Sequence, residues 1–223
     1  MPDDDLEYTI RRSPRARRIR VKVDPYAGVE VVLPQRAAKR EAQEAIAQLR
    51  PWIDRRLAEA RVARARLQPP AGTVPFLGAH LRLLRDEHRT RAQRSADTLH
   101  LPARNTQQAL ERWYRTEARK EIEPRLAEAT RALGRRYTSL AIRNQRTRWG
   151  SCSATGAMSF NWRLMLAPEP VLDYVVWHEA CHLVVMDHSR RFWALVERHV
   201  PGYREPRRWL RQNGAALVLP EQP

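Results

Sequence analysis

The sequence contains little cysteine and no long apolar run. Only two of its 223 residues are cysteines, Cys152 and Cys181. No stretch approaches the roughly 18 consecutive apolar residues that cross a bilayer. Residues 1–5 are acidic, whereas a secretory signal is basic and then apolar. We therefore expect a cytoplasmic protein that does not span a membrane, with both cysteines as reduced thiols.

The chain carries a strong excess of positive charge. Lysine and arginine total 41 against 25 acidic residues, so the net charge is +16 and the pI is about 11.1. This charge favours polyanionic partners, and a nucleic acid or a nucleotide is one candidate. Arginine is spread over most of the chain, however, so an arginine-rich composition without any such ligand is the alternative.

The N-terminal sequence predicts two strands followed by a helix. Basic residues alternate with apolar ones at 18–23, which predicts a strand with one basic and one apolar face. Turn-forming residues at 24–28 lead into a second strand at 29–34, so we expect a hairpin. Its basic face could follow a phosphate backbone or could simply face solvent. Apolar residues at helical spacing then predict a helix at 37–67, which Pro51 should divide or kink.

A linker containing proline and glycine, at 68–72, is the clearest candidate boundary inside the chain. Further strands are predicted beyond it, at 74–84 and 99–101. We therefore expect residues 1–103 to form a β-rich N-terminal part with a helical insert at about 37–67. Residues 104–223 are expected to form a second domain.

The second domain is predicted to mix helices and strands. Its first helix has an apolar stripe and ends at Gly134, and a later helix opens at Pro168 and Pro170, where the first turn tolerates proline. The predicted segments are a helix at 106–133, a strand at 137–143, a polar loop at 144–153, a turn at 154–156 and a strand at 158–166.

The most specific motif is the sequence His-Glu-Ala-Cys-His at 178–182. Residues four apart share one face of a helix, so His178 and His182 point the same way with Glu179 beside them. This is the H-E-x-x-H arrangement of zinc hydrolases. The residues from 171 to 186 are apolar around nearly the whole helix, which predicts burial. Two imidazoles and a carboxylate are costly to bury unless a cation satisfies them; core histidines bonded to carbonyls are the alternative.

A catalytic zinc ion needs a third protein ligand and an open position for water. His188 is preferred as that ligand, because it follows His182 by the six-residue step of H-E-x-x-H-x-x-G-x-x-H metallopeptidases. His199 is the rival. Val185 occupies the glycine position of that longer motif, so we expect the helix to continue and the chain to bend at 186–187.

The positions of several neighbours predict roles for them. Glu179 is expected to act as general base on a metal-activated water and to pass the proton to the leaving group. Asp187 could accept a hydrogen bond from a ligand imidazole. Ser189 could cap a following helix, whose Phe192 would fix the loop against the core.

The remaining polar residues are harder to assign. Candidates for the oxyanion donor are Tyr203, Arg148 and Asn144, each of which could instead be structural. Cys181 lies off the ligand face of the helix and is expected to pack in the core. Cys152 is expected to be structural, although a thiolate near zinc would bind the metal or inhibit the site.

Four segments, in this order along the chain, resemble a known family. They are RWGSCS at 148–153, FNWRL at 160–164, YVVWHEACHL at 174–183 and HSRRFW at 188–193. Together they resemble the YgjP-like metal-dependent hydrolases, which are zincin-type proteins related to the SprT-like and WLM metallopeptidases. The resemblance extends from the N-terminal hairpin to Leu210 and is strongest at 148–193.

The resemblance implies an α+β protein in which residues 104–223 form a zincin-like catalytic domain. It implies one zinc ion on His178, His182 and His188, with Glu179 catalytic. In zincins an edge strand before the active helix pairs with an extended peptide, and the matching segment is 158–166. Candidate substrate contacts near the motif are Asn161, Trp162, Arg148 and Tyr203.

Three functions are therefore compared. The first is a zinc-dependent metallopeptidase acting on a protein or peptide. The second is a metal-dependent nucleotide phosphohydrolase, because a metal can also polarise a phosphoryl oxygen. The third is a nucleic-acid-binding protein with a structural zinc site. SprT-like relatives act on DNA-bound proteins, which would suit the positive charge, but the chain has no recognisable zinc-ribbon cysteine set.

Overall fold

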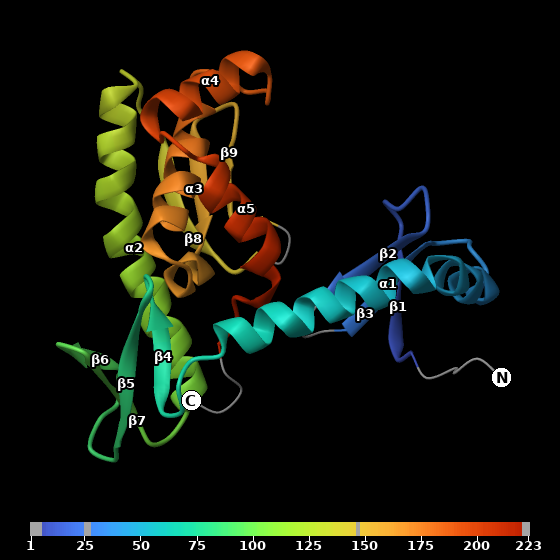
Figure 1. Cartoon of the computed structure of the whole chain (residues 1–223), viewed down its shortest axis with the longest axis horizontal. Helices are drawn as coiled ribbons and strands as arrows, with labels where there is room; N and C mark the ends of the chain where they lie inside the picture. Colours follow the sequence, from blue (N-terminus) through green and yellow to red (C-terminus); the bar gives the residue numbers. More distant parts are fainter. Residues whose placement is uncertain (1–5, 25–27, 146–147, 220–223) are drawn as a thin grey trace. The chain divides into compact units, whose positions relative to one another are not determined.

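The computed structural model describes residues 6–24, 28–145 and 148–219. It divides into two compact units, residues 1–67 and 68–223 (Figure 1). Helices and small sheets both contribute, so the expected α+β class is confirmed. Among the described residues, no helix combines the length and the apolar character needed to cross a membrane.

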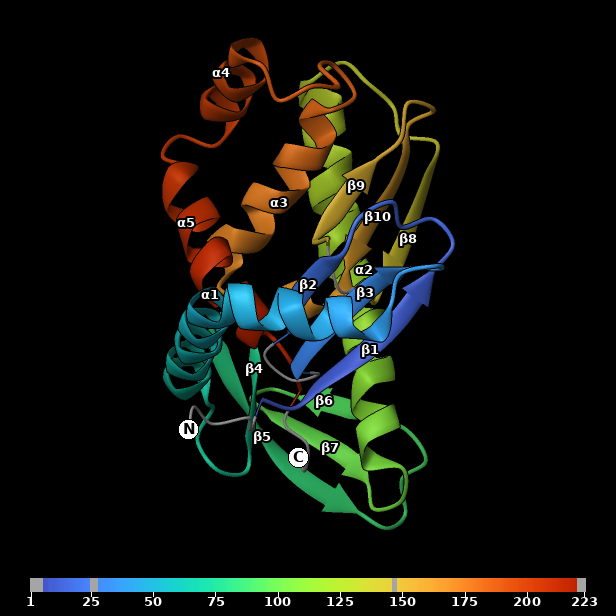
Figure 2. The same ribbon diagram turned by 90° about the vertical axis from the view of Figure 1, so that its right-hand side faces the viewer.

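The first unit is a three-stranded sheet with one long helix. Its elements are β1 (Tyr8–Ser13), β2 (Arg20–Asp24), β3 (Gly28–Pro34) and α1 (Lys39–Leu67). The strand order is β1-β3-β2. β2 and β3 form the predicted antiparallel hairpin, whereas β1 is parallel to β3 and was not predicted. α1 is continuous through Pro51, and its axis changes direction along its length (Figure 2).

The core of the first unit explains the hairpin's alternation. Val29, Val31 and Leu33 of β3 are buried together with Ile46 and Ile53 of α1. The opposite face of β2 is basic and exposed, as expected. Part of its charge is compensated within the sheet by an ion pair (Lys22 Nζ–Glu30 Oε2, 3.4 Å).

The described residues of the second unit form two sheets, four α-helices and two 3-10 helices. The first sheet has the order β4-β5-β7-β6, and the second has the order β8-β10-β9. The strands are β4 (Thr73–Phe76), β5 (Ala79–Asp86), β6 (Gln93–Ser95), β7 (Thr98–Pro102), β8 (Ser139–Arg143), β9 (Gly150–Cys152) and β10 (Ala157–Asn161). The helices are α2 (Thr106–Ala132), η1 (Trp162–Leu166), α3 (Glu169–Cys181), α4 (Arg190–His199), α5 (Arg204–Asn213) and η2 (Gly214–Ala216).

Helix α2 packs against most other parts of this unit, including α3, η1, β7 and β8. Its predicted apolar stripe is buried, and α2 packs along α3, as Figure 2 also shows. Tyr114 of α2 is fully buried, donates its hydroxyl to the carbonyl of Pro75, and stacks on Trp162 with ring centroids 5.7 Å apart. These contacts fix η1, and therefore the start of α3, against β4.

The strand predicted at 158–166 is wrong in its length and in its place in the sheet. β10 ends at Asn161, whose side-chain oxygen accepts the backbone N–H of Arg163 at 3.1 Å and starts the 3-10 helix η1. Residues 164–166 belong to η1 and are all buried. β10 is also the central strand, parallel to β8 and antiparallel to β9. The edge strands of this sheet are therefore β8 and β9, and β9 is the one that contacts α3.

The expected continuation of the active helix to residue 186 is wrong as well. α3 ends at Cys181, and the next residues form a tight turn with Leu183 N–Ala180 O and Val184 N–Cys181 O hydrogen bonds, each 3.0 Å long. Such three-residue spacing is common where a helix ends. The turn keeps Val185 buried, so the bend is made without the glycine of the longer metallopeptidase motif.

The domain boundary expected after residue 103 stays a prediction. The division between the two compact units falls between Leu67 and Gln68, at the predicted linker. Strands β4 to β7, which the sequence grouped with the N-terminal part, lie in the same compact unit as α2.

Candidate metal centre

Helix α3 and the turn after it bring His178 and His182 together. His178 lies in the last turn of α3, His182 is its C-terminal cap, and their ring centroids are 5.0 Å apart. His182 Nδ1 lies 3.1 Å from the carbonyl oxygen of Val185. A carbonyl can only accept, so Nδ1 donates and Nε2 keeps its lone pair. His182 is therefore held in the tautomer that binds a metal through Nε2.

The loop between α3 and α4 supplies a third imidazole. His188 Nε2 lies 3.1 Å from His178 Nε2, and its ring centroid is 4.8 Å from that of His182. One possible ligand atom from each histidine lies within 4.8 Å of the others. Nitrogen ligands about 2.0–2.1 Å from a tetrahedral zinc ion are roughly 3.3 Å apart. The three residues therefore fit a metal ion of this kind.

The electrostatics of the site favour the ligand form of these histidines. Burial, followed by the nearby His182, His188 and Arg207, lowers the pKa of His178 to about 3. Burial also lowers the pKa of His182. Neutral imidazole is the form that coordinates a metal. At neutral pH the buried histidines are therefore ready to bind a cation without first losing a proton.

Glu179 lies between α3 and the edge strand β9. Its side chain is buried, with 7% exposed. Burial raises the pKa of the Glu179 carboxyl to about 7, against the opposing effects of Arg148 and of the hydrogen bond from the Cys152 backbone N–H. A carboxyl with a pKa near neutrality can both accept and return a proton.

Gly150 makes room for this carboxyl. A Cβ added to Gly150 would lie 2.5 Å from Cγ and 2.7 Å from Oε1 of Glu179. Real Cβ atoms do not approach other atoms so closely, so any other residue here would displace the carboxyl. Glycine is therefore required at position 150 because a side chain would clash with Glu179, and not because the backbone makes a turn there.

Aromatic rings form a shell around the histidines. The ring of His182 stacks on that of Phe192, with centroids 4.4 Å apart. Phe192 is fully buried, as expected for a residue that fixes the loop against the core. Behind His178, the ring of Tyr203 stacks on Tyr174 at 6.2 Å and on Trp193 at 5.2 Å. This shell restricts the imidazole orientations and lowers the local polarity.

The histidines and Glu179 open into a cavity of about 410 Å³. It is bordered by β9, α3, the turn after α3 and the buried Leu210 of α5. Its described lining residues are Arg148, Trp149, Gly150, Ser151, Cys152, Tyr174, Val175, His178, Glu179, His182, Met186, His188 and Leu210.

Of the four candidate substrate contacts, Arg148 lines this cavity and the other three do not. The Asn161 side chain donates to the carbonyl oxygens of Gln145 (2.6 Å) and Arg148 (3.3 Å). Trp162 is 1% exposed and packs on Tyr114. Tyr203 is buried behind Tyr174. Asn161 and Tyr203 therefore contact lining residues from behind, whereas Trp162 packs in the core.

Other predicted neighbours lie apart from the histidines or bond elsewhere. His199 stacks on Trp177, with centroids 4.6 Å apart, and is not part of the histidine group. Asp187 accepts the Ser189 backbone N–H at 3.0 Å, whereas the acceptor for His182 is the Val185 carbonyl. Ser189 occupies the cap position of α4 without a side-chain cap hydrogen bond.

The two cysteines also have different surroundings. Cys181 is fully buried, and burial raises the pKa of its thiol to about 12, which fits packing in the core. Cys152 lines the cavity, and burial together with Glu179 raises the pKa of its thiol to about 11. In the described ranges neither thiol belongs to the group that could hold a metal.

Comparison with known proteins identifies the class. The sequence profile of the YgjP-like metallopeptidase domain matches residues 17–213. The chain belongs to this YgjP-like family and is a metal-dependent hydrolase of the metallopeptidase type. No curated protein matches the chain. A similar solved structure is the metallopeptidase zymogen of Pyrococcus abyssi abylysin, with 26% identity, 41% of this chain and 93% of that chain covered, and a TM-score of 0.37.

The sequence did not reveal three parts of the site. These are the edge strand β9, the contact between Gly150 and Glu179, and the aromatic group of Tyr174, Trp193 and Tyr203. The RWGSCS segment at 148–153 was the available signal for the first two, because it precedes the active helix and combines a glycine with small polar residues. The aromatic group joins α3, α4 and the cap of α5, so its members have no local pattern.

Proposed function

We propose that the protein is a zinc-dependent peptidase in which His178, His182 and His188 hold one zinc ion. The observation that carries the proposal is the convergence of three imidazoles beside a buried carboxyl, at the open edge of a strand. A catalytic zinc ion usually has three protein ligands and an open position, and three histidines are one such ligand set. Residues 104–223, with α3 as the active helix, form the zincin-like catalytic domain in this proposal.

The metal ion, when bound, provides Lewis acidity that lowers the pKa of water and polarises a substrate carbonyl. The protein provides the geometry. His182 is fixed by the Val185 carbonyl, and Phe192 packs against its ring. This support keeps the imidazole directed at the metal position while substrate enters and product leaves.

Glu179 is the general base. Its carboxyl takes a proton from the attacking water and returns it to the amine of the leaving group. The Cys152 backbone N–H and the absence of a side chain at Gly150 hold the carboxyl at one place on β9. Arg148 lines the cavity and is the proposed polar contact to the substrate, whereas Tyr203 positions Tyr174 from behind.

The open edge of β9 is the proposed binding line for the peptide backbone. Ser151 pairs with Ser159 of β10, and the carbonyl of Trp149 accepts the N–H of Asn161 at 2.8 Å. In an antiparallel pair, residues alternate between facing the partner and facing away. The backbone groups of Gly150 and Cys152 therefore face away from β10. The Cys152 N–H donates to Glu179, so an extended peptide would add as a further strand through the Gly150 backbone and the Cys152 carbonyl. This role replaces the one expected for 158–166.

The test combines metal analysis with parallel substrates. Purified wild-type protein should contain about one zinc ion per chain, and metal-loaded wild type should cleave casein, whereas Glu179→Gln should bind zinc and lose cleavage by about 100-fold or more. A DNA-bound protein and nucleoside triphosphates are tested side by side. Hydrolysis of triphosphates alone would replace the peptidase with a phosphohydrolase. Absence of zinc, with unchanged activity in Glu179→Gln, would overturn the proposed centre.

A further inference from the structure

A second cavity adjoins the metal centre on the side of α5. Its volume is about 460 Å³. Trp149, Tyr174 and Leu210 line both cavities, so the two spaces share a wall. The remaining lining residues are four arginines of α5: Arg204, Arg207, Arg208 and Arg211.

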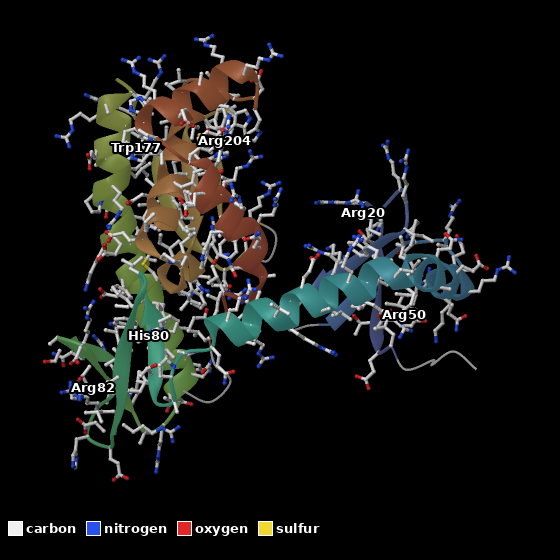
Figure 3. All side chains as sticks on the ribbon, in the orientation of Figure 1. Arg20, Arg50, His80, Arg82, Trp177 and Arg204 are labelled. Atoms are coloured by element: carbon white, nitrogen blue, oxygen red, sulfur yellow. The ribbon has the colours of Figure 1, made fainter. Side chains whose placement is uncertain are left out.

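The four arginines form one face of α5. Their spacings of three, one and three residues place them along a single side of a helix, while Leu210 anchors the helix in the core. All four side chains are exposed, and Arg204, labelled in Figure 3, lies in the first turn. No acidic side chain is among the described residues that line the cavity.

This concentration of charge is uncompensated in the part of the chain that the structure describes. The ion pairs of the described residues join arginines of other elements to acids, as in Arg125–Asp173 at 2.9 Å, but none includes an arginine of α5. Arg207 lies over the ring of Trp193, with Cζ 4.3 Å from the centroid. A cavity lined by four like charges attracts anions.

The wall between the cavities is fixed by a second close contact. A Cβ added to Gly214 of η2 would lie 2.9 Å from Cζ2 of Trp149. Trp149 directly precedes β9. A peptide that pairs with the open edge of β9 and extends past Trp149 therefore reaches the arginines of α5.

We propose that this cavity is a specificity subsite that receives an acidic side chain, Asp or Glu, of the peptide beside the bond that is cleaved. The inference rests on the proposed peptidase function and names its substrate class. Guanidinium groups recognise carboxylates through paired hydrogen bonds. A peptide is favoured over a polynucleotide because the cavity shares a wall with the metal centre beside a strand edge, and a strand edge recognises an extended peptide backbone.

Binding to an inactive variant tests the subsite independently of cleavage. Zinc-loaded Glu179→Gln full-length chain is titrated into two dye-labelled octapeptides, one alternating Glu with Ala and one with Gln in place of every Glu. Fluorescence anisotropy should show binding of the Glu peptide about tenfold tighter than the Gln peptide at low salt. The difference should shrink at about 0.3 M salt, because the arginines are exposed.

A matched pair of charge-removing variants separates the subsite from the overall charge. Arg204→Gln with Arg208→Gln should abolish most of the tenfold preference. Arg135→Gln with Arg136→Gln removes the same charge from an exposed loop outside both cavities and should keep it. Equal losses in the two variants, or equal binding of the two peptides to the chain with all its arginines, would overturn the subsite. Circular dichroism verifies that both variants are folded.

Two further experiments distinguish an incorrect subsite from an incorrect peptidase function. A single-stranded oligonucleotide of matched charge competes with the Glu peptide; stronger binding of the oligonucleotide that also depends on Arg204 and Arg208 would overturn the peptide assignment. Cleavage by the metal-loaded wild type is measured on both peptides. Equal cleavage of both would overturn the subsite and leave the peptidase intact. Selective binding of the Glu peptide without any cleavage would leave the subsite standing and remove the peptidase.

Discussion

Two helices of the second unit border the site, and they differ in almost every physical respect. α3 is buried on nearly all sides and carries His178 and Glu179 into the core. α5 has one buried residue, Leu210, and presents arginines to solvent. Glu179 is thus buried and His178 half-buried where they line the cavity, whereas the arginines proposed to select the substrate are exposed to solvent.

Burial has opposite effects on the two titratable groups of α3. It lowers the pKa of His178 to about 3 and raises the pKa of Glu179 to about 7. Both shifts favour the uncharged form, which is what transfer from water to a core does. Burial on α3 therefore gives His178 the neutral form that the proposed ligand role needs, and gives Glu179 a pKa near neutrality, as the proposed base needs, from the same cause. The first variants below compare buried with exposed positions.

The largest effect is expected from loss of a metal ligand. His178→Ala should weaken zinc binding on the order of a hundredfold or more, because one of three protein ligands is lost. His199→Ala is the matched control, since His199 stacks on Trp177 outside the histidine group. Competition with a fluorescent zinc chelator measures both affinities. If His199→Ala weakens binding as much as His178→Ala, the ligand set is different.

Stability should depend on α3 far more than on α5. Leu172 is fully buried in α3, so Leu172→Ala should lower the free energy of unfolding by about 2–5 kcal/mol. Arg211→Ala on the exposed face of α5 should change it by about 0.5 kcal/mol or less. Urea unfolding followed by tryptophan fluorescence compares the two. Similar losses would mean that the α5 arginines pack structurally and would weaken the case for a free cationic face.

The sequence predicted the parts of this site that follow local rules. The four-residue spacing of His178 and His182 and the apolar surroundings of α3 depend on helix geometry alone, and the six-residue step to His188 depends on a short loop. The structure brings these three histidines together as expected. The hairpin of β2 and β3 and the stripe of α2 were predicted for the same reason, because one period describes each.

The parts that sequence reasoning missed depend on tertiary contacts. β9 contains three residues, too few for an alternating pattern to appear, and its meaning comes from pairing with β10 and from the contact of Gly150 with Glu179. The segment at 158–166 was predicted as a strand after the turn at 154–156, and its place at the sheet edge was implied by the resemblance to zincins. Its apolar residues have no period that separates a buried strand from a 3-10 helix, so the end of the strand at Asn161 was missed. The sequence alone did not distinguish the α5 arginines from the other arginines of the chain, because only the fold brings them beside Trp149.

A third comparison uses the two glycines that lie under the walls of the site. Gly150→Ala introduces a Cβ 2.5 Å from Glu179 Cγ, so cleavage should fall by about 100-fold while zinc binding is kept. Gly214→Ala introduces a Cβ 2.9 Å from Trp149 Cζ2, on the α5 side, and should reduce the preference for the Glu peptide a few-fold with little change in cleavage of a neutral peptide. Steady-state kinetics and zinc content are measured for both. Loss of zinc from Gly150→Ala would show that β9 supports the ligands and not the base.

The smallest effect is a change in the pH dependence of stability of the metal-free protein. The pKa of His178 falls from 6.5 to about 3 on folding, so the unfolded state binds the extra proton below about pH 6.5 and the free energy of unfolding decreases as the pH falls. The pKa of Glu179 rises from 4.5 to about 7, so its contribution is fully present below pH 4.5 and is lost as the pH rises through 7. Between pH 4.5 and 6.5 the two groups oppose each other.

Glu179→Gln removes the opposing contribution and keeps the side-chain volume. In EDTA, the free energy of unfolding of the variant should therefore fall more steeply than that of wild type as the pH is lowered from 6.5 to 4.5. Urea midpoints at several pH values in this window measure the difference. Parallel curves would mean that Glu179 takes up no proton on folding in this window. Burial of the Glu179 carboxyl would then not raise its pKa, although desolvation is the cause given for the shift. In this respect Glu179 would behave like a group on the exposed face of α5.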